Sequence, residues 1–599
     1  MRAQDTPAPA PLQEVTVTAR KVQESVINVP MSISVLSAKT LNDYGIRDFV
    51  DYATRIPNLS FAYGGATSGN AGLGFSTSRG TAIRGVSGLN TTGFYIDDTP
   101  VFDSMDPRIV DIDRIEVLKG PQGTLYGSGS MGGNIRIITR KPSTSEDGFR
   151  YALLGGYTHG GSFDDGMEAA GNVVLSPGLL GVRVMGFYSF DSPFLTRRYP
   201  VPSAPGTFAE RPDGKDGADG ASLALLVTPV ERLEVTLRML YQRQYTGGWP
   251  APFAPLPAFA VVSDTLNRLV DAQEASTDRW TLPSLDLDYH GQGWGIVSST
   301  SYFERYTYDR EDGTEGTTYA YEQAGFTPLP GVPLYWEGYT HTTRLAHETR
   351  LSVEETHRLR GIAGVYYADR HQLIHDPPQN TPGLAAAGAW PDDNGYSADT
   401  INPTRETAVF GELYWHALDP LTLTIGARTY WLREQSSTTA DGFFQGGLFV
   451  QPLTTSKEHG TSPKFALDYH FAERTMGYAL ASRGFRPGGI NLALPDACIP
   501  ELSALGLNQQ SALSYKSDSV WNYELGMKSE LAPGGVLMSG SLFQINWQQI
   551  QQGIYLPVCG FSILGNSGAA RNRGAEFELT GRVAGALTAH VSAGYLDAV

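Results

Sequence analysis

Apolar and polar residues alternate along most of the chain after residue 149. Residues 233–241, 421–431 and 587–595 show this most clearly, because every second residue is apolar and those between are mostly polar or small. A period of two places the two sets on opposite faces of a β-strand. The pattern therefore predicts strands of about ten residues, with aromatic side chains at their ends.

The connections between these predicted strands alternate in length. Tight turns such as residues 418–420 alternate along the chain with long polar loops such as residues 375–403 and 488–517. Long loops at one end and tight turns at the other are typical of an outer-membrane β-barrel. A large soluble sandwich or propeller is the alternative, but neither is expected to show this one-sided asymmetry.

Composition agrees with this fold class and excludes others. The 599 residues carry a formal net charge of −17, which argues against nucleic-acid binding as the main task. The sequence contains no run of about 18 apolar residues, the length that a membrane helix needs. The two cysteines exclude a four-cysteine zinc site, and the 11 histidines show no convincing metal or catalytic spacing. We therefore predict no enzyme activity, no resident cofactor and no protein-bound metal.

A glycine-rich stretch raises one alternative function. Residues 127–132 read GSGSMG, a literal G-x-G-x-x-G of the kind that binds dinucleotides. That function requires a helix directly after the glycines. Residues 134–140, NIRIITR, are rich in β-branched residues and predict a strand instead. The glycines are therefore expected to permit positive φ angles and close backbone approach in a loop between strands.

Several short segments occur in a fixed order along the chain. They are EVTVTA at residues 14–19, IRG at 83–85, FYIDD at 94–98, DRIEVLKGPQGTLYG at 113–127, GFRPGG at 484–489, WNYELG at 521–526 and GAE at 574–576. Together they resemble a TonB-dependent outer-membrane receptor over essentially the whole length from Glu14. Asp98 stands where this family usually has glycine, so the turn at this position is expected to differ.

The resemblance implies an all-β transmembrane barrel with an N-terminal α+β plug domain inside its lumen. The expected parts are a flexible leader at 1–13, a TonB box at 14–19, the plug at 20–145 and the barrel at 149–599. Barrels of this class have about 22 strands, whereas we count about 17 here. Unpaired strand edges are not tolerated in lipid, so we expect a chain that lacks its C-terminal strands.

The resemblance also implies specific site residues. The TonB box would comprise Glu14, Val15, Thr16, Val17, Thr18 and Ala19, an extended segment suited to adding a strand to a partner's sheet. Alternation points Glu524 and Glu576 into the lumen, where buried carboxylates need partners. In this family such glutamates pair with basic plug residues, here Arg84 and Lys119. Solvated lumen carboxylates remain the alternative.

Two further sets of residues follow from the expected layout. Cys498 and Cys559 fall in long loops that would be extracellular, where a disulfide between them is the expected state and two free thiols the alternative. Tyr63 and Arg79 lie in or beside the expected apical loops of the plug and are candidate ligand contacts. A solvated arginine is the alternative for Arg79.

As the resemblance implies, the expected function is TonB-dependent uptake of a scarce nutrient across the bacterial outer membrane, with a ferric siderophore favoured. A carbohydrate, cobalamin or another organic substrate is the alternative, and a passive porin-like channel is less favoured because a TonB box is present. The expected partners are TonB with its inner-membrane energising complex, the small-molecule ligand, and outer-membrane lipid with lipopolysaccharide. We expect a monomer that binds no nucleic acid.

Overall fold

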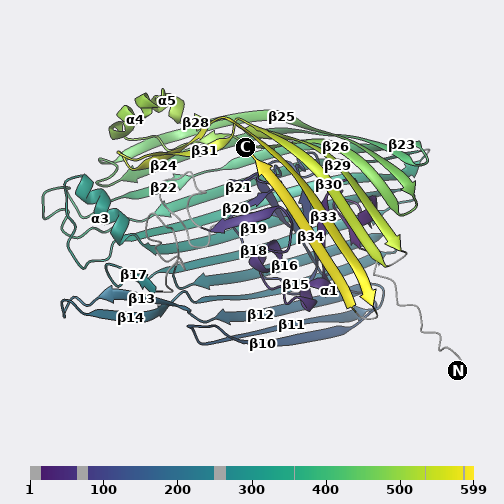
Figure 1. Ribbon diagram of the computed structural model, residues 1–599, viewed down its shortest axis with the longest axis horizontal. Coiled ribbons are helices and arrows are strands. Elements are labelled where there is room, and N and C mark those ends of the chain that lie inside the picture. The colour runs from purple at the N-terminus through teal and green to yellow at the C-terminus, as the bar shows by residue number, and fades with distance from the viewer. Residues whose placement is uncertain (1–14, 64–78, 249–264, 357, 533–534, 585–586) are drawn as a thin grey trace.

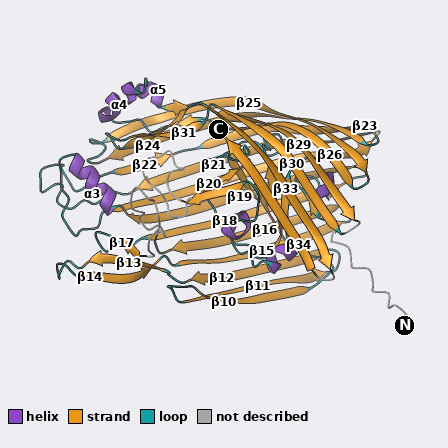
Figure 2. Cartoon of the chain, viewed as in Figure 1, coloured by secondary structure: helices purple, strands orange, loops and turns teal. Residues whose placement is uncertain are grey.

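The computed structural model describes residues 15–63, 79–248, 265–356, 358–532, 535–584 and 587–599. A small N-terminal sheet and two short helices lie within the curve of one very large antiparallel sheet (Figure 1). Strands dominate the chain, and the helices are few and short (Figure 2). Within the described residues, no helix is long and apolar enough to cross a membrane.

The large sheet forms the wall and contains 18 strands. In sheet order they are β10 (Gly148–Tyr157), β11 (Phe163–Ser176), β12 (Leu180–Asp191), β15 (Asp216–Val230), β16 (Leu233–Thr246), β18 (Ala275–His290), β19 (Trp294–Asp312), β20 (Tyr335–Thr356), β21 (Leu359–Asp376), β22 (Ser397–Ile401), β23 (Thr404–Leu418), β24 (Leu421–Asp441), β25 (Phe449–Ala472), β26 (Thr475–Arg486), β29 (Asp518–Ala532), β30 (Val536–Gln548), β33 (Ala569–Ala584) and β34 (Leu587–Ala598).

The strand count exceeds the expected 17 because of β22. This five-residue strand pairs with both β21 and β24 and is separated from β23 by Asn402 and Pro403. The sequence pattern placed residues 397–401 inside the long loop at 375–403, so this strand was not predicted. Proline has no backbone N–H to give to the ladder, so Pro403 separates β22 from β23. The expected lack of C-terminal strands stays a prediction. The sheet order ends at β10 and β34, which are not paired with each other in the described part.

Alternation along the wall strands sorts their residues as predicted. In β24, Thr422, Thr424 and Arg428 are buried on the inner face, whereas Ile425 and Trp431 are half exposed on the outer face. The apolar set therefore faces outward and the polar set faces the plug. This distribution of apolar and polar side chains is the reverse of that in a soluble sandwich, and it fits a wall that contacts lipid.

The N-terminal part, which we call the plug, is built on a five-stranded sheet in the order β3-β8-β9-β6-β7. Its elements are β1 (Thr16–Val17), β2 (Glu24–Ser25), β3 (Ile33–Ser37), α1 (Ala38–Asp43), α2 (Phe49–Ala53), β4 (Leu59–Tyr63), β5 (Arg79–Ile83), β6 (Thr92–Ile96), β7 (Thr99–Val101), β8 (Ile112–Lys119) and β9 (Gly133–Thr139), with a 3-10 turn at Val26–Asn28. The strand predicted after the glycine run is β9. The apolar core between this sheet and the helices continues onto Trp280 and Phe303 of the wall.

The long loops fold into additional small elements at one end of the wall, where Figure 1 shows the helices α3, α4 and α5. These elements are β13 (Leu195–Pro200), β14 (Phe208–Asp213), β17 (Thr265–Asn267), α3 (Thr314–Gln323), β27 (Gly489–Ile490), a 3-10 turn (Asp496–Cys498), α4 (Ile499–Ala504), α5 (Gln509–Ala512), β28 (Ser514–Tyr515), β31 (Gln551–Leu556) and β32 (Phe561–Asn566). By the one-sided loop pattern, this end is the extracellular end.

Candidate functional site

The predicted TonB box is folded against the plug. Glu14 lies outside the described residues, and Val15 precedes β1, in which Thr16 and Val17 pair with β2. The Thr18 backbone N–H donates to the Glu116 carboxylate at 2.9 Å. The Tyr126 hydroxyl donates to the Ala19 carbonyl at 3.0 Å. Val17 and Ala19 are fully buried, so the described part of the box is not presented to a partner in this conformation.

The residues directly after the box contact both plug and wall. The Lys21 ammonium lies 3.0 Å from Glu348 of β20 and 3.6 Å from Asp98 of the plug. Asp98 also accepts from Arg350 of β20 at 2.8 Å and lies 3.6 Å from Arg136 of β9. Burial acts to raise the pKa of the Asp98 carboxyl, but Arg350, Lys21 and Arg136 outweigh it and hold this pKa below its usual range. The aspartate at this position thus joins three cations from three parts of the chain.

Arg84 occupies the centre of the plug–wall contact. Its Nη1 lies 2.5 Å from Glu524 of β29, and its Nη2 lies 2.8 Å from Glu576 of β33. All three side chains are buried, and the guanidinium lies 4.1 Å from the centre of the Phe543 ring. Burial acts to lower the pKa of Arg84, but the two carboxylates outweigh it and raise this pKa. The arginine is therefore charged and bridges the plug to two strands of the wall.

Lys119 lies beside this group with a different first partner from the expected one. Its ammonium is 3.0 Å from Glu578 and 4.0 Å from Glu576. Ser32 adds two contacts that sequence reasoning missed, since its N–H donates to Glu524 at 2.9 Å and its hydroxyl to Glu576 at 2.7 Å. Glu578 was detectable from sequence, because it is two residues after Glu576 on the same face of β33.

The glycine run sits where the plug approaches the wall. Gly127 has a φ of +82°, and a Cβ there would lie 2.8 Å from the guanidinium of Arg428 on β24. Gly133 brings β9 against β8, where a Cβ would meet the Leu118 carbonyl at 2.1 Å. The glycines thus serve positive φ and close approach, as the sequence predicted.

A cavity of about 710 Å³ lies between the upper plug and the wall. Plug residues such as Asn90, Tyr95 and Asp103 form one side, and residues of β20 to β26 form the other. Arg344 of β20 and Arg370 of β21 line it directly opposite each other in the strand register. Like charges directly opposite each other are destabilising, so their presence calls for an anion.

The two arginines have only neutral partners among the described residues. Arg344 donates to the Pro100 carbonyl at 3.1 Å. Arg370 donates to the Asn402 amide oxygen at 3.2 Å and the Thr404 hydroxyl at 2.7 Å. Neither forms an ion pair with a described carboxylate. The cavity therefore presents two guanidinium groups without a direct ion pair, although the carboxylates of Glu406 and Glu434 also line it.

Asp103 places a titratable group in the same cavity. Its side chain is buried, and one carboxylate oxygen has no hydrogen-bond partner in the described part of the structure. Burial raises the pKa of this carboxyl to about 6, and the nearby Arg79 offsets only part of that rise. The charge of the cavity floor therefore changes with pH near neutrality.

Among the two candidate ligand contacts, Arg79 is not one of the described residues that line this cavity. Arg79 is 1% exposed. It donates to the Asp103 and Met105 carbonyls at 2.8 and 2.6 Å and lies 3.4 Å above the Phe49 ring. It is thus an internal plug residue, and this arrangement does not support contact with a ligand. Tyr63 ends β4 opposite Arg79, and its side chain lies outside the described part.

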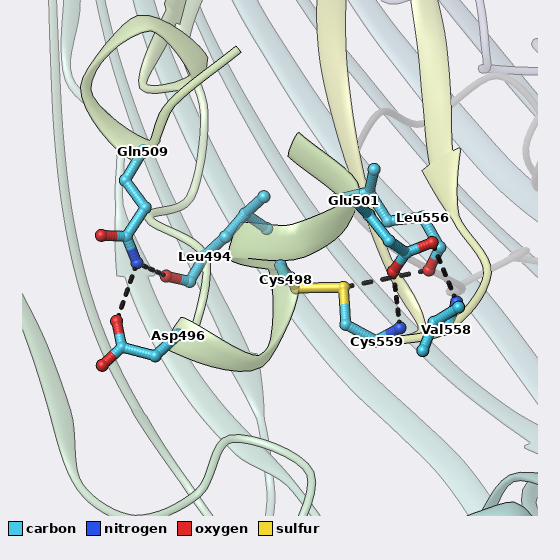
Figure 3. Close-up of a disulfide and its surroundings, with 8 residues drawn as sticks. All are labelled: Leu494, Asp496, Cys498, Glu501, Gln509, Leu556, Val558 and Cys559. Carbon is cyan, nitrogen blue, oxygen red and sulfur yellow. Dashed lines mark hydrogen bonds between the residues drawn. A yellow bond between two sulfur atoms is a disulfide. The ribbon is translucent and has the colours of Figure 1, made fainter. Parts of the chain in front are cut away.

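Cys498 and Cys559 form a disulfide between two extracellular loops (Figure 3). The Glu501 carboxylate, one turn along in α4, accepts the backbone N–H groups of Val558 and Cys559 at 3.0 and 2.8 Å. Leu502, Leu556 and neighbouring apolar residues pack around the bridge. The disulfide and these contacts join α4 to the β31–β32 hairpin beside the cavity mouth.

Comparison with known families agrees with this geometry. The family model described as "TonB dependent receptor-like, beta-barrel" matches residues 233–598, and the "TonB-dependent Receptor Plug Domain" model matches residues 25–134. The barrel model alone matches more than half of the chain.

Individual relatives are distant, and some of them span most of the chain. A pesticin receptor of Yersinia enterocolitica is 23% identical over 583 residues, which cover 95% of this chain and 75% of the relative. An iron-regulated outer membrane virulence protein of Vibrio cholerae is 33% identical over 133 residues, 22% of this chain and 20% of that protein. The structure of the ferric yersiniabactin uptake receptor of Yersinia pestis superposes with a TM-score of 0.74 at 17% identity, covering 95% of this chain and 79% of the other. This chain belongs to the TonB-dependent receptor family of the bacterial outer membrane.

Proposed function

We propose that this protein takes up an anionic ferric chelate of the siderophore class, in a TonB-dependent manner. The cavity between plug and wall carries this proposal, because Arg344 and Arg370 face each other in it without a carboxylate partner among the described residues. Ferric siderophores are compact and often anionic, and Arg is suited to binding delocalised negative charge. Tyr95, Tyr366 and Tyr515 add aromatic surface to the lining.

The similar proteins support the same ligand class. Their names include a ferric yersiniabactin receptor, an alcaligin receptor of Bordetella pertussis and a ferripyoverdine receptor of Pseudomonas aeruginosa. A relative that matches 95% of this chain is called a pesticin receptor. These ligands differ from one another, so they support a class of ligand and not a particular compound.

We propose that TonB acts on residues 14–19 and that force then passes along the segment that follows. From Lys21 to Ser32 this segment contacts Glu348, Lys528, Glu524 and Glu576 of the wall. These polar contacts are accompanied by apolar packing, since Val29 and Met31 share a buried cluster with wall residues such as Leu480. In this proposal residues 20–145 form the movable plug, residues 149–599 form the wall, and the protein acts as a monomer.

The test is uptake of radiolabelled iron by cells that produce this receptor in place of their own siderophore receptors. A panel of ferric siderophores of different charge is compared between wild type and a variant lacking residues 14–19. The expected result is uptake of at least one anionic ferric siderophore that the deletion abolishes. Uptake that survives the deletion would indicate a passive channel, and uptake of cobalamin or a saccharide alone would refute the ligand class.

The role of the cavity is tested separately with purified receptor. We expect R344Q/R370Q to weaken binding of the anionic chelate at least tenfold, since each charged hydrogen bond contributes about 1.5–3 kcal/mol. R232Q/R358Q is the matched control, because it removes two exposed arginines at the short-turn end. Equal affinity of the two variants would contradict the assignment of the cavity as the binding site.

A further inference from the structure

Arg428 of β24 is a buried cation on the inner wall, close to the cavity but not among the described residues that line it. Its Nη2 donates to the Glu406 carboxylate at 3.2 Å. Its Nε and Nη1 have no hydrogen-bond partner in the described part of the structure. A buried guanidinium that uses only some of its donors is unfavourable. The site is therefore suited to a further anionic partner.

The strand register places Arg428 deeper in the wall than the cavity arginines. Arg370 lies opposite Thr404 of β23, and Arg428 lies opposite Phe410 of the same strand. Because β23 runs from the extracellular loops to the short turn after Leu418, Phe410 is nearer the short-turn end. The six residues from Thr404 to Phe410 span about 20 Å along the strand. At a tilt of about 45° this corresponds to about 14 Å of depth.

The inner wall between these two levels carries small side chains and one aromatic ring. Ala368 of β21 and Ala408 of β23 are buried there and leave the wall narrow. The Tyr366 ring lines the cavity, and its centre lies 4.9 Å from the Arg428 guanidinium. Tyr366 thus connects the cavity surface to Arg428.

A short plug segment separates the cavity from Arg428. We call residues 126–129 the floor segment, since Tyr126, Ser128 and Gly129 line the cavity. The Ser128 hydroxyl donates to the Glu406 carboxylate at 2.8 Å. A Cβ on Gly127 would lie 2.8 Å from the Arg428 guanidinium, so the backbone of this segment packs directly on it. Displacement of the floor segment would therefore expose Arg428 to the cavity.

The floor segment is bonded to the predicted TonB box. The Tyr126 hydroxyl donates to the Ala19 carbonyl at 3.0 Å and lies 3.5 Å from the Thr18 carbonyl. Withdrawal of Thr18 and Ala19 would remove both acceptors from this buried hydroxyl. The segment that covers Arg428 is thus one hydrogen bond away from the residues on which TonB is proposed to act.

We propose that Arg428 is a second anion site, which receives the ferric chelate from Arg344 and Arg370 once TonB withdraws Thr18 and Ala19 and the floor segment is released. The inference rests on the proposed function, because it takes the ligand to be an anionic ferric chelate. While the floor segment is in place, the chelate is bound by the cavity residues alone. Arg428 therefore acts in transfer of the ligand and not in its first binding.

The first test compares binding with uptake. We expect R428Q to keep the affinity of the purified receptor for the ferric chelate within about twofold of wild type. Its maximal rate of TonB-dependent uptake is expected to fall about tenfold, the contribution of one charged hydrogen bond. R428K retains the charge and is expected to transport faster than R428Q.

The matched control is R305Q. Arg305 of β19 is also buried, pairs with Asp278 of the wall at 2.8 Å and donates to Ser104 of the plug at 2.9 Å. It is not among the described residues of the cavity lining. We expect R305Q to transport at the wild-type rate. Retention of the heat-sensitive electrophoretic mobility of a folded barrel confirms that each variant is folded.

The outcomes separate this inference from the proposed function. An unchanged maximal rate in R428Q, an equal loss in R305Q, or equal rates in R428K and R428Q would overturn the role of Arg428 alone. If wild type takes up no anionic ferric chelate, the proposed function is refuted, and the role of Arg428 as a ligand site is refuted with it.

The second test follows the floor segment and needs no ligand. A408C places a thiol between the cavity and Arg428, and both native cysteines are held in the disulfide. We expect a sulfonate-bearing methanethiosulfonate to label purified A408C several times faster when residues 14–19 are deleted. A224C, at a buried position of β15, is expected to react equally with and without the deletion. Equal labelling of A408C in both backgrounds would overturn the link between the box and the floor segment.

Discussion

At the scale of single residues, buried charges hold the plug to the wall alongside the apolar clusters that the two parts share. Arg84 meets Glu524 and Glu576, and Lys119 meets Glu578. A buried charge without its partner is far more costly than the intact pair is favourable. Replacing one of these residues therefore lowers stability chiefly because its partner remains buried and charged without a counter-ion.

The first prediction concerns Arg84. We expect R84Q to lower the free energy of unfolding by about 3–5 kcal/mol, because Glu524 and Glu576 would remain buried without a cation. The measurement is guanidinium denaturation followed by tryptophan fluorescence. K39Q removes one member of the exposed Lys39–Asp43 pair and is expected to change stability by less than about 1 kcal/mol. Similar stability of the two variants would show that Arg84 is not the central plug–wall contact.

The second prediction concerns Asp103 and pH. Its carboxyl has a pKa raised to about 6 by burial, so it is mostly neutral at pH 5 and mostly ionised at pH 7. The ionised form repels an anionic ligand in the cavity, so we expect affinity to fall as pH rises from 5 to 7. D103N is expected to remove this dependence. The measurement is fluorescence titration with a ferric chelate whose own charge is constant over this range, and equal pH dependence in both proteins would contradict the prediction.

At the scale of elements, the short strands at the N-terminus connect the TonB-box region to the wall. Lys21 lies in the turn between β1 and β2 and contacts Glu348 of β20 and Asp98 after β6. The Asp98 carboxylate contacts Lys21, Arg136 and Arg350. These contacts form an ionic link between the N-terminal segment, the plug and the wall.

The third prediction tests that link. Arg20 and Lys21 are buried, so trypsin cleavage after them requires release of the segment. We expect D98N to increase the rate of this cleavage about three- to tenfold, because one charged contact of Lys21 is lost. D113N, which alters the exposed pair with Arg114, is the control and should match wild type. An unchanged rate in D98N would show that the segment is held by its other contacts alone.

Sequence reasoning succeeded where a local rule determines the outcome. The period of two fixed the strand faces in β24, and β-branched residues identified β9. Sequence reasoning did not predict features that depend on which strands are neighbours in the folded protein. The pairing of Arg344 with Arg370 follows from the register of β20 and β21, and the burial of Arg79 follows from the packing of Phe49 and the Asp103 loop. Neither is encoded in the spacing of residues near it.

At the scale of the whole molecule, the wall is a single sheet whose order runs from β10 to β34. Both faces of β34 are exposed along its length, whereas strands such as β26 and β29 have a neighbour on each side. The residues of β10 are likewise mostly exposed. The wall is thus expected to be least rigid at these two strands.

The fourth prediction follows from this order. Amide hydrogens of β10 and β34 that are not bonded to a neighbouring strand are expected to exchange faster than those of β26 and β29. The measurement is hydrogen–deuterium exchange of the receptor in detergent, read by mass spectrometry. Equal protection of all four strands would mean that another polypeptide covers these edges, and analytical ultracentrifugation would then show whether it is a second copy of the chain.

The polar contacts of the N-terminal segment have a mechanical consequence. Thr18, Lys21, Val26 and Ser32 contact successive points of the plug and wall in chain order. A force applied on the N-terminal side of Thr18 therefore breaks these contacts one after another and not all at once. Breaking the contacts in sequence spreads the work over a longer distance. The peak force therefore stays near the force that breaks a single contact. An energising complex that applies a small force over a long distance is thus sufficient to release this segment.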